Sequence, residues 1–171
     1  MSRPVCIAFR AATLAGFMLL AGGAIGAAPG SLLHKPAPDF VRKDIQGQAV
    51  DMASYRGRVV LLTFWATWCA PCQVEMPHFV RWQSEFAPQG FQIIAVSMDD
   101  DAAPVVALTR KRHVNYPVVM GDERLGILYG GVMGLPVNFL IDRHGMVAGI
   151  FKGGSHLDAM KARIRDLLAA R

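Results

Sequence analysis

Two cysteines, Cys69 and Cys72, are separated by only two residues, Ala70 and Pro71. A disulfide that closes so short a loop removes little chain entropy, so a purely structural bridge explains the pair poorly. A reactive dithiol explains it better. If a helix begins here, Cys69 lies at its N-terminus, where unpaired backbone N–H groups and the helix dipole stabilise a thiolate. We therefore predict that Cys69 is the attacking nucleophile of a thiol–disulfide exchange centre.

The neighbouring residues support this chemistry. Cys72 lies one turn further along, so it can reach back to Cys69 and resolve a mixed disulfide, and we expect it to be the less exposed thiol. Pro71 suits a first helical turn because its missing N–H would have no partner there. Trp68 offers an apolar wall beside the thiol. The sequence predicts that Cys69 and Cys72 form a redox-active disulfide.

Other uses of a cysteine pair fit less well. Attachment of a c-type haem requires histidine directly after the second cysteine, where this chain has Gln73. A structural zinc site needs four ligands, and the two cysteines with His78 fall short. A thiol peroxidase would want threonine where Ala66 stands. We expect no bound metal or cofactor, although two thiolates bind Cu(I) well and a copper carrier remains an alternative.

Runs of apolar residues indicate the elements that must position this pair. Residues 59–65 and 91–98 read as buried strands, and residues 71–86 between them as a helix kinked at Pro77. A helix over 102–112 and a short strand over 117–121 follow. This βαβα order predicts a largely parallel sheet. Further expected elements are a short strand within 39–45, a hairpin of strands 137–141 and 146–151, and a terminal helix from about 157.

The N-terminal residues have the layout of an export signal. Arg3 and Arg10 precede or flank an almost wholly apolar stretch, 11–27, that ends in small residues. We predict a signal peptide over 1–28 and one domain over 29–171. Cleavage would discard Cys6. Retention of the segment as a membrane anchor is the alternative, so the predicted location is periplasmic or exported, with a possible tether to the inner membrane.

Length and charge restrict the class of protein. A chain of 171 residues, 53% of them hydrophobic, is long enough for one domain with a substantial core. Removing Arg3 and Arg10 from the 18 basic residues leaves 16, against 13 acidic ones. This small excess gives no reason to expect a nucleic-acid partner.

Several motifs together resemble the TlpA/ResA-like thioredoxin family. They are residues 64–72 with Glu75 and Pro77, the segment 35–40, and Gly134-Leu135-Pro136 followed by 139–142. The resemblance implies a thioredoxin fold, with a central mixed sheet flanked by helices and an N-terminal extension. It also implies a cis peptide bond at Pro136 beside the cysteines. The Leu135 backbone would then be presented to an extended target chain, which makes Trp68, Leu135 and Pro136 the predicted substrate-binding residues.

Glu75 is a third candidate catalytic residue. It follows Cys72 by three positions, on the same face of the expected helix. Thioredoxins have a buried aspartate where this chain has Thr63, and the resemblance implies that Glu75 takes over proton transfer. The alternative is a solvated glutamate without a catalytic part. Where two threonines are common in the family, this chain has Val137-Asn138, a departure that we expect to alter the rim of the substrate groove.

A second acidic feature, Asp99-Asp100-Asp101, lies between a predicted strand and a predicted helix. It could bind a cation, but capping of the helix that begins at Ala102 is the simpler explanation. The five histidines are scattered and form no evident site.

These observations favour a reductase of disulfides in exported proteins. The resemblance suggests a membrane thiol-electron carrier as the electron donor and apocytochrome c maturation as a client pathway. A disulfide-donating oxidant is the alternative, because roughly 150 mV separates thioredoxin from a strong oxidant and the direction of exchange follows the potential.

Overall fold

The computed structural model describes residues 31–170. The predicted signal at 1–28, with Cys6, lies outside these residues. The strands are β1 (Val41–Lys43), β2 (Ala49–Asp51), β3 (Val59–Trp65), β4 (Phe91–Ser97), β5 (Val118–Met120), β6 (Val137–Ile141) and β7 (Val147–Lys152). The helices are α1 (Ala70–Phe86), α2 (Ala102–Lys111), α3 (Glu123–Leu128) and α4 (Leu157–Ala169), with short 3-10 turns at Met52–Tyr55 and Ala87–Gln89.

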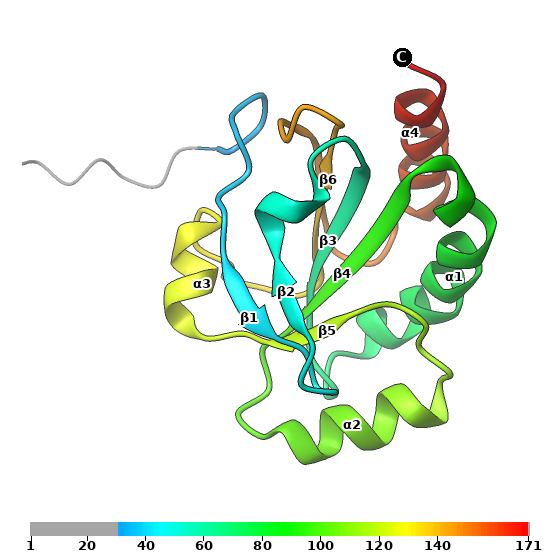
Figure 1. Cartoon of the computed structure of the whole chain (residues 1–171). Helices are drawn as coiled ribbons and strands as arrows, with labels where there is room; N and C mark the ends of the chain where they lie inside the picture. Colours follow the sequence, from blue (N-terminus) through cyan, green and yellow to red (C-terminus); the bar gives the residue numbers. More distant parts are fainter. Residues whose placement is uncertain (1–30, 171) are drawn as a thin grey trace, which may run out of the picture.

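A five-stranded sheet in the order β5-β4-β3-β6-β7 forms the centre of the molecule (Figure 1). Strand β3 pairs in parallel with β4, from Val59 opposite Phe91 to Trp65 opposite Ser97, and antiparallel with β6. Strands β6 and β7 form the expected antiparallel hairpin. The predicted mixed α/β thioredoxin fold is confirmed.

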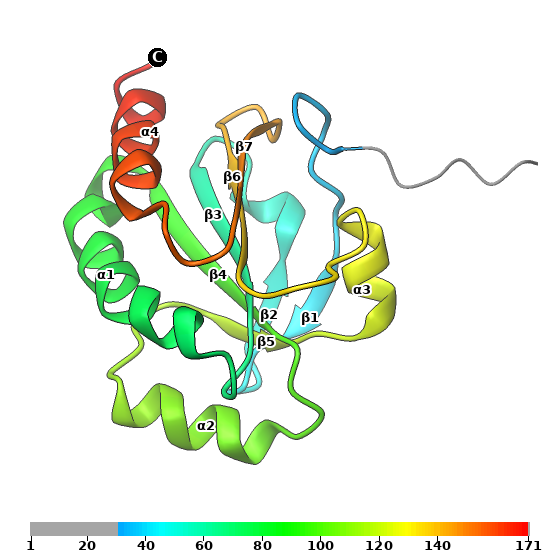
Figure 2. The ribbon, with the colours of Figure 1, turned by 180° about the vertical axis from the view of Figure 1, so that it is seen from behind.

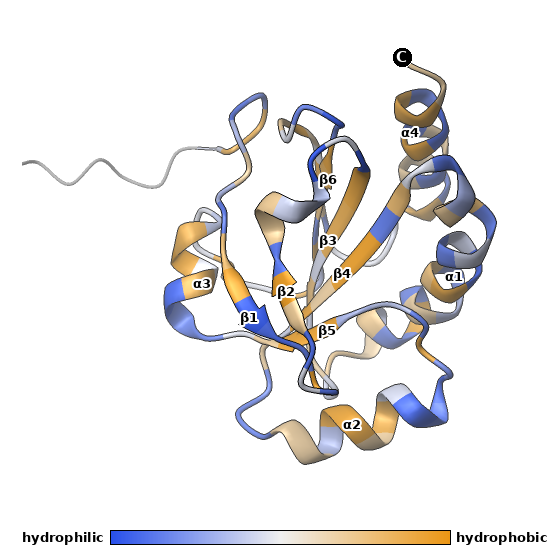
Figure 3. Ribbon diagram, in the orientation of Figure 1, coloured by the Kyte–Doolittle hydropathy of each residue, from blue (hydrophilic) through white to orange (hydrophobic). Residues whose placement is uncertain are grey.

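Strand β3 is buried along its whole length because both faces of the sheet are covered. Val59, Leu61 and Trp65 pack with apolar side chains of α1 and α4, while Val60 and the other alternate residues pack on the opposite face with the N-terminal strands and α3. Figure 2 shows α1 and α4 on one side of the sheet, away from α3 and β1. In Figure 3 the central strands are mostly orange, whereas α2 and α4 alternate in colour.

Two small features were not expected from the sequence. Strand β2 pairs with β1 in a separate two-stranded sheet, and α3 follows β5. Three-residue strands and a six-residue helix are too short to show a hydrophobic period, which is why the pattern missed them. Within residues 31–170, no helix combines the length and the apolar character that crossing a membrane requires.

Candidate active site

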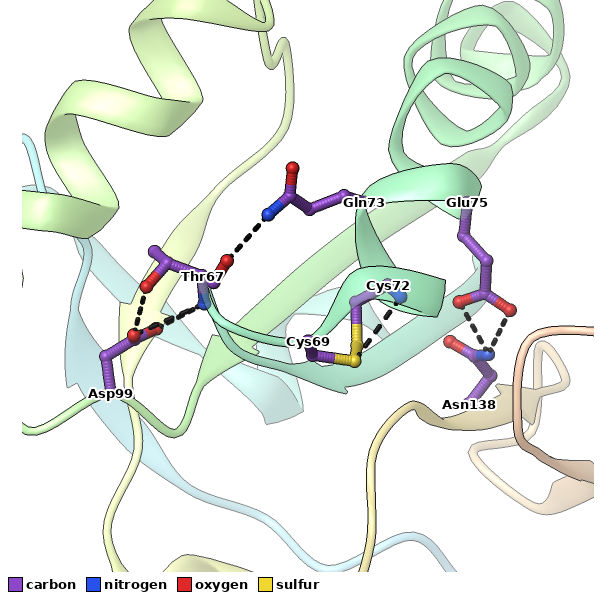
Figure 4. Close-up of a disulfide and its surroundings, with 7 residues drawn as sticks. All are labelled: Thr67, Cys69, Cys72, Gln73, Glu75, Asp99 and Asn138. Carbon is purple, nitrogen blue, oxygen red and sulfur yellow. Dashed lines mark hydrogen bonds between the residues drawn. A yellow bond between two sulfur atoms is a disulfide. The ribbon is translucent and has the colours of Figure 1, made fainter.

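The two cysteines form a disulfide at the start of α1 (Figure 4). Their Cα atoms are 5.3 Å apart. Cys69 is the residue that caps the helix, and the backbone N–H of Cys72 donates to its Sγ atom at 3.3 Å. Both cysteines are buried, at 5% exposure for Cys69 and 3% for Cys72, whereas neighbouring Trp68 is 70% exposed. The sulfur that caps the helix is thus in contact with the backbone dipoles that stabilise a thiolate.

Asp99 holds the loop that leads into Cys69. The backbone N–H of Thr67 donates to both Asp99 carboxylate oxygens, at 2.9 and 3.2 Å, and the Thr67 hydroxyl donates to Oδ1. The Ser97 hydroxyl donates to Oδ2 at 2.7 Å. Asp101 is the N-cap residue of α2, as expected, but its side chain makes no capping hydrogen bond. Asp99 binds the cysteine loop instead.

The same loop is held from its other side by Gln73. The side-chain amide of Gln73 donates to the Thr67 carbonyl at 2.7 Å, and Arg112 donates to the Gln73 side-chain oxygen at 3.3 Å. Both backbone groups of Thr67 are therefore bound by side chains, one from beyond β4 and one from α1 (Figure 4). This fixes the backbone two residues before the nucleophile.

Glu75 lies on the inner face of α1 and is only 1% exposed, so the alternative of a solvated glutamate was wrong. The side-chain amide of Asn138 donates to both carboxylate oxygens at 3.2 Å. Burial dominates over this hydrogen bond and raises the pKa of Glu75 from its ordinary value of 4.5 to about 7. Glu75 can therefore exchange a proton near neutral pH.

A small cavity connects Glu75 with Cys72. Thr63, Trp65 and Tyr116 also line it, and the volume open to the centre of a water molecule is about 10 Å³. Roughly this volume is needed for one water. The indole Nε1 of Trp65 is buried and has no hydrogen-bond partner among the described residues. Burial and the nearby Glu75 carboxylate raise the pKa of the Tyr116 hydroxyl, so Tyr116 remains a neutral neighbour.

The peptide bond between Leu135 and Pro136 is cis, as the resemblance implied. Both residues line a groove of about 760 Å³. The Pro136 carbonyl accepts from Gly153 at 2.9 Å, and a Cβ atom on the next residue, Gly154, would lie 2.7 Å from the Cβ of Pro71. The cis-proline segment is therefore linked to the start of the cysteine helix through closely packed glycines.

The structure thus brings Cys69, Cys72 and Glu75 to one end of α1, with Leu135 and Pro136 on an adjoining segment. Asn138 was expected on the rim of the substrate groove, but it does not lie there. It is fully buried, because its position on β6 opposite Thr63 turns its side chain to the α1 face of the sheet.

None of Asp99, Gln73 and Asn138 was expected to contact the redox centre or the residues that support it. A signal existed for Asp99: the residues that follow neighbouring parallel strands meet at one edge of a sheet, so residues after β3 and β4 could have been paired. No such signal existed for Asn138, because the antiparallel register of β6 against β3 is a tertiary property.

Within residues 31–170, no group of three or more His, Cys, Asp or Glu side chains is placed to hold a metal ion. The fold and the vicinal dithiol define the class of protein, a thioredoxin-fold thiol:disulfide oxidoreductase.

Comparisons with known proteins agree. Residues 33–150 match the AhpC/TSA family. The thiol-disulfide oxidoreductase ResA of Bacillus thuringiensis subsp. konkukian is 34% identical over 135 residues, or 79% of this chain and 78% of that protein. ResA of Geobacillus thermodenitrificans is 33% identical over 131 residues, 77% of this chain and 75% of its own. A crystal structure of a putative thiol:disulfide interchange protein DsbE from Chlorobium tepidum superposes with a TM-score of 0.77 at 30% identity, covering 82% of this chain and all of that one. The chain belongs to the AhpC/TSA family, among its ResA-like thiol:disulfide oxidoreductases.

Proposed function

We propose that the protein reduces disulfide bonds in exported proteins, with Cys69 as nucleophile, Cys72 as resolving thiol and Glu75 as proton acceptor. The observation that carries this proposal is the dithiol at the N-terminus of α1 with a buried carboxyl group in the same small cavity as Cys72. The Cys69 nucleophile alone would start exchange. A resolving thiol with its own proton acceptor completes it.

The reaction has two steps. The Cys69 thiolate attacks one sulfur of the client disulfide, so that a mixed disulfide forms and one client thiolate leaves. Cys72 then gives its thiol proton to the Glu75 carboxylate, and its thiolate attacks the Cys69 sulfur. This step forms the Cys69–Cys72 disulfide and releases the second client thiolate, which takes up a proton from solvent. Two electrons pass from the protein to the client.

The groove beside the cis-proline supports a polypeptide substrate. Leu135 is half-buried and Pro136 buried, and both line the groove, where the main chain of Leu135 would bind an extended client chain. Exposed Trp68 and, at the groove, Met133, which is 96% exposed, add apolar surface. We therefore assign Trp68, Leu135 and Pro136 to client binding. Recognition through the main chain would place little demand on the client sequence.

Two further assignments rest on the sequence. The layout of residues 1–28 supports export, and an exported reductant in an oxidising compartment must be recharged, which favours a membrane thiol-electron carrier as donor. The family resemblance supports apocytochrome c as a client, since the attachment motif of c-type haem is itself a Cys-x-x-Cys pair that must be reduced.

The reduction potential of the Cys69–Cys72 pair tests the direction of exchange. The chain without residues 1–28 is equilibrated against glutathione or dithiothreitol buffers. A value near or below about −230 mV supports a reductase, whereas a value near about −120 mV makes the protein an oxidant and overturns the proposal. Stoichiometric Cu(I) binding without reduction of insulin would instead identify a copper carrier.

Membership of the AhpC/TSA family also raises the question whether the protein reduces peroxides. Ala66 occupies the position where a thiol peroxidase would have threonine relative to Cys69, and it is fully buried. It has no hydroxyl to offer a peroxide. We expect no peroxide consumption above that of a free thiol, which a direct peroxide assay measures.

A further inference from the structure

Asn138 stands out because half of its side-chain amide is unused. The residue is fully buried on β6, and its Nδ2 atom donates to both oxygens of Glu75 at 3.2 Å. Its Oδ1 atom is also buried and has no hydrogen-bond partner among the described residues. Figure 4 shows the amide group pointing toward the Glu75 carboxylate. An unused buried acceptor beside a titratable group is informative, because buried polar atoms are seldom left without partners.

The protonation state of Glu75 decides what the amide can do. An ionised carboxylate only accepts hydrogen bonds, so it can pair with Nδ2 and leaves Oδ1 without a donor. A protonated carboxyl group carries an O–H donor as well as a carbonyl acceptor. With Glu75 protonated, the same two groups can form two hydrogen bonds, N–H to carbonyl and O–H to Oδ1, after a small rotation about the side-chain bonds.

We infer that Asn138 is a positioning residue that pairs with Glu75 in both protonation states and so holds the carboxyl group beside Cys72 while its proton comes and goes. This inference rests on the proposed role of Glu75 as proton acceptor, but it concerns a different residue and a separately measurable contact. This pairing gives a reason for an amide side chain at a fully buried position opposite Thr63.

Few other groups act on Glu75. The titratable groups lining its cavity are Cys72, one turn earlier on α1, and Tyr116, ahead of β5. Thr63 and Trp65 of β3 and Ala95 of β4 bring no charge. Asn138 is the only side chain with a hydrogen bond to the Glu75 carboxylate among the described residues. The proton affinity of Glu75 should therefore respond to Asn138 more than to any other single side chain.

The first test needs no substitution. The oxidised wild-type chain is titrated by NMR, and the carboxyl carbon of Glu75 and the side-chain amide of Asn138 are followed together. We expect both to shift with one midpoint near pH 7, because the Oδ1 atom gains a donor as Glu75 gains its proton. An Asn138 amide signal that stays constant while Glu75 titrates would overturn the inference.

Two variants give the second test. Asn138→Leu keeps the number and branching of the side-chain heavy atoms but loses both hydrogen-bonding atoms, and Asn138→Thr retains one hydroxyl that donates and accepts. A hydrogen bond to a charged group is roughly twice as strong as a neutral one, so in Asn138→Leu the carboxylate loses one strong bond and the acid loses two weaker ones. The pKa of Glu75 should therefore rise by less than about one unit in this variant and stay closer still to the wild-type value in Asn138→Thr.

The pH profile of the resolving step should move with the pKa of Glu75 in both variants. A rise of about two units in Asn138→Leu, as expected when a charge-assisted hydrogen bond is lost from the carboxylate alone, would overturn the inference. The proposed function would still stand if Glu75→Gln slows exchange. Conversely, if Glu75→Gln has no effect on exchange but the amide and carboxyl signals still titrate together, the pairing is supported and the catalytic role of Glu75 fails.

Discussion

Two carboxylates flank the disulfide, and their surroundings differ. Asp99 is partly exposed and accepts hydrogen bonds from the Thr67 N–H, the Thr67 hydroxyl and the Ser97 hydroxyl. Glu75 is almost fully buried and has one donor, the amide of Asn138. The hydrogen bonds that Asp99 accepts tie it to the backbone of the cysteine loop. Glu75 accepts from one side chain only, which does not compensate for its burial, and burial raises its pKa to about 7.

The comparison shows that residue type alone does not tell what an acid does near a redox pair. A carboxylate that is well supplied with donors serves as an anchor for the backbone. A buried one with a single donor becomes a group that gains and loses a proton at working pH. The predictions that follow test this division of roles, beginning with the largest expected effect.

The pH dependence of stability should reveal Glu75 most strongly. Below pH of about 4.5 the carboxyl group is protonated in both states. As pH rises to about 7, the unfolded chain releases the proton while the folded chain retains it, so the stability of the wild type should fall by about 3 kcal/mol relative to Glu75→Gln. Urea unfolding of both oxidised proteins across this range measures the difference. Parallel stability curves would show that Glu75 titrates normally.

The rate of the resolving step should depend on Glu75 and not on charge along α1 in general. Glu75→Gln removes the proton acceptor, so release of client from the mixed disulfide should slow about 100-fold at neutral pH, equivalent to about 2.7 kcal/mol. Stopped-flow kinetics of that release measure it. The matched control is Glu85→Gln, which removes a surface carboxylate paired with Lys161 at 2.8 Å and should leave the rate unchanged. Equal rates in all three proteins would refute the catalytic assignment.

Asp99 should matter for stability more than for proton transfer. Asp99→Asn places an amide where the Thr67 N–H needs acceptors, and loss of these charge-assisted bonds should cost about 2 kcal/mol in the free energy of unfolding. Neighbouring Asp100 is exposed, so Asp100→Asn serves as the control and should stay within about 0.5 kcal/mol. A resolving step slowed as much as in Glu75→Gln would erase the distinction between the two carboxylates.

The smallest effect on stability is expected for Gln73 and Arg112, which hold the cysteine loop on the side of the Thr67 carbonyl. Gln73→Ala removes the donor to the Thr67 carbonyl and should lower the free energy of unfolding by about 1 kcal/mol. Arg112→Ala removes only an exposed contact of 3.3 Å to Gln73 and should change it by less. Thermal or urea unfolding ranks the two. If Arg112→Ala proved the more harmful, the loop would depend on the arginine and not on the amide.

Much of the fold followed from hydrophobic patterns. The central strands and α1 lie where the apolar runs predicted them, because seven consecutive buried residues in β3 and helical spacing in α1 are strong local signals. The short elements β2 and α3 lacked such signals. At the site, the cysteine spacing identified the redox pair, and the family motifs indicated the cis bond at Pro136.

The sequence by itself determined the chemistry of this protein, since two thiols three positions apart at a strand-to-helix junction depend only on local order along the chain. Tertiary structure alone decided which carboxylate does what. Thr67 and Asp99 are 32 residues apart, and Glu75 and Asn138 are 63 apart. Contacts at such separations depend on strand register and burial, which no local pattern encodes, and burial is what changes the proton affinity of Glu75.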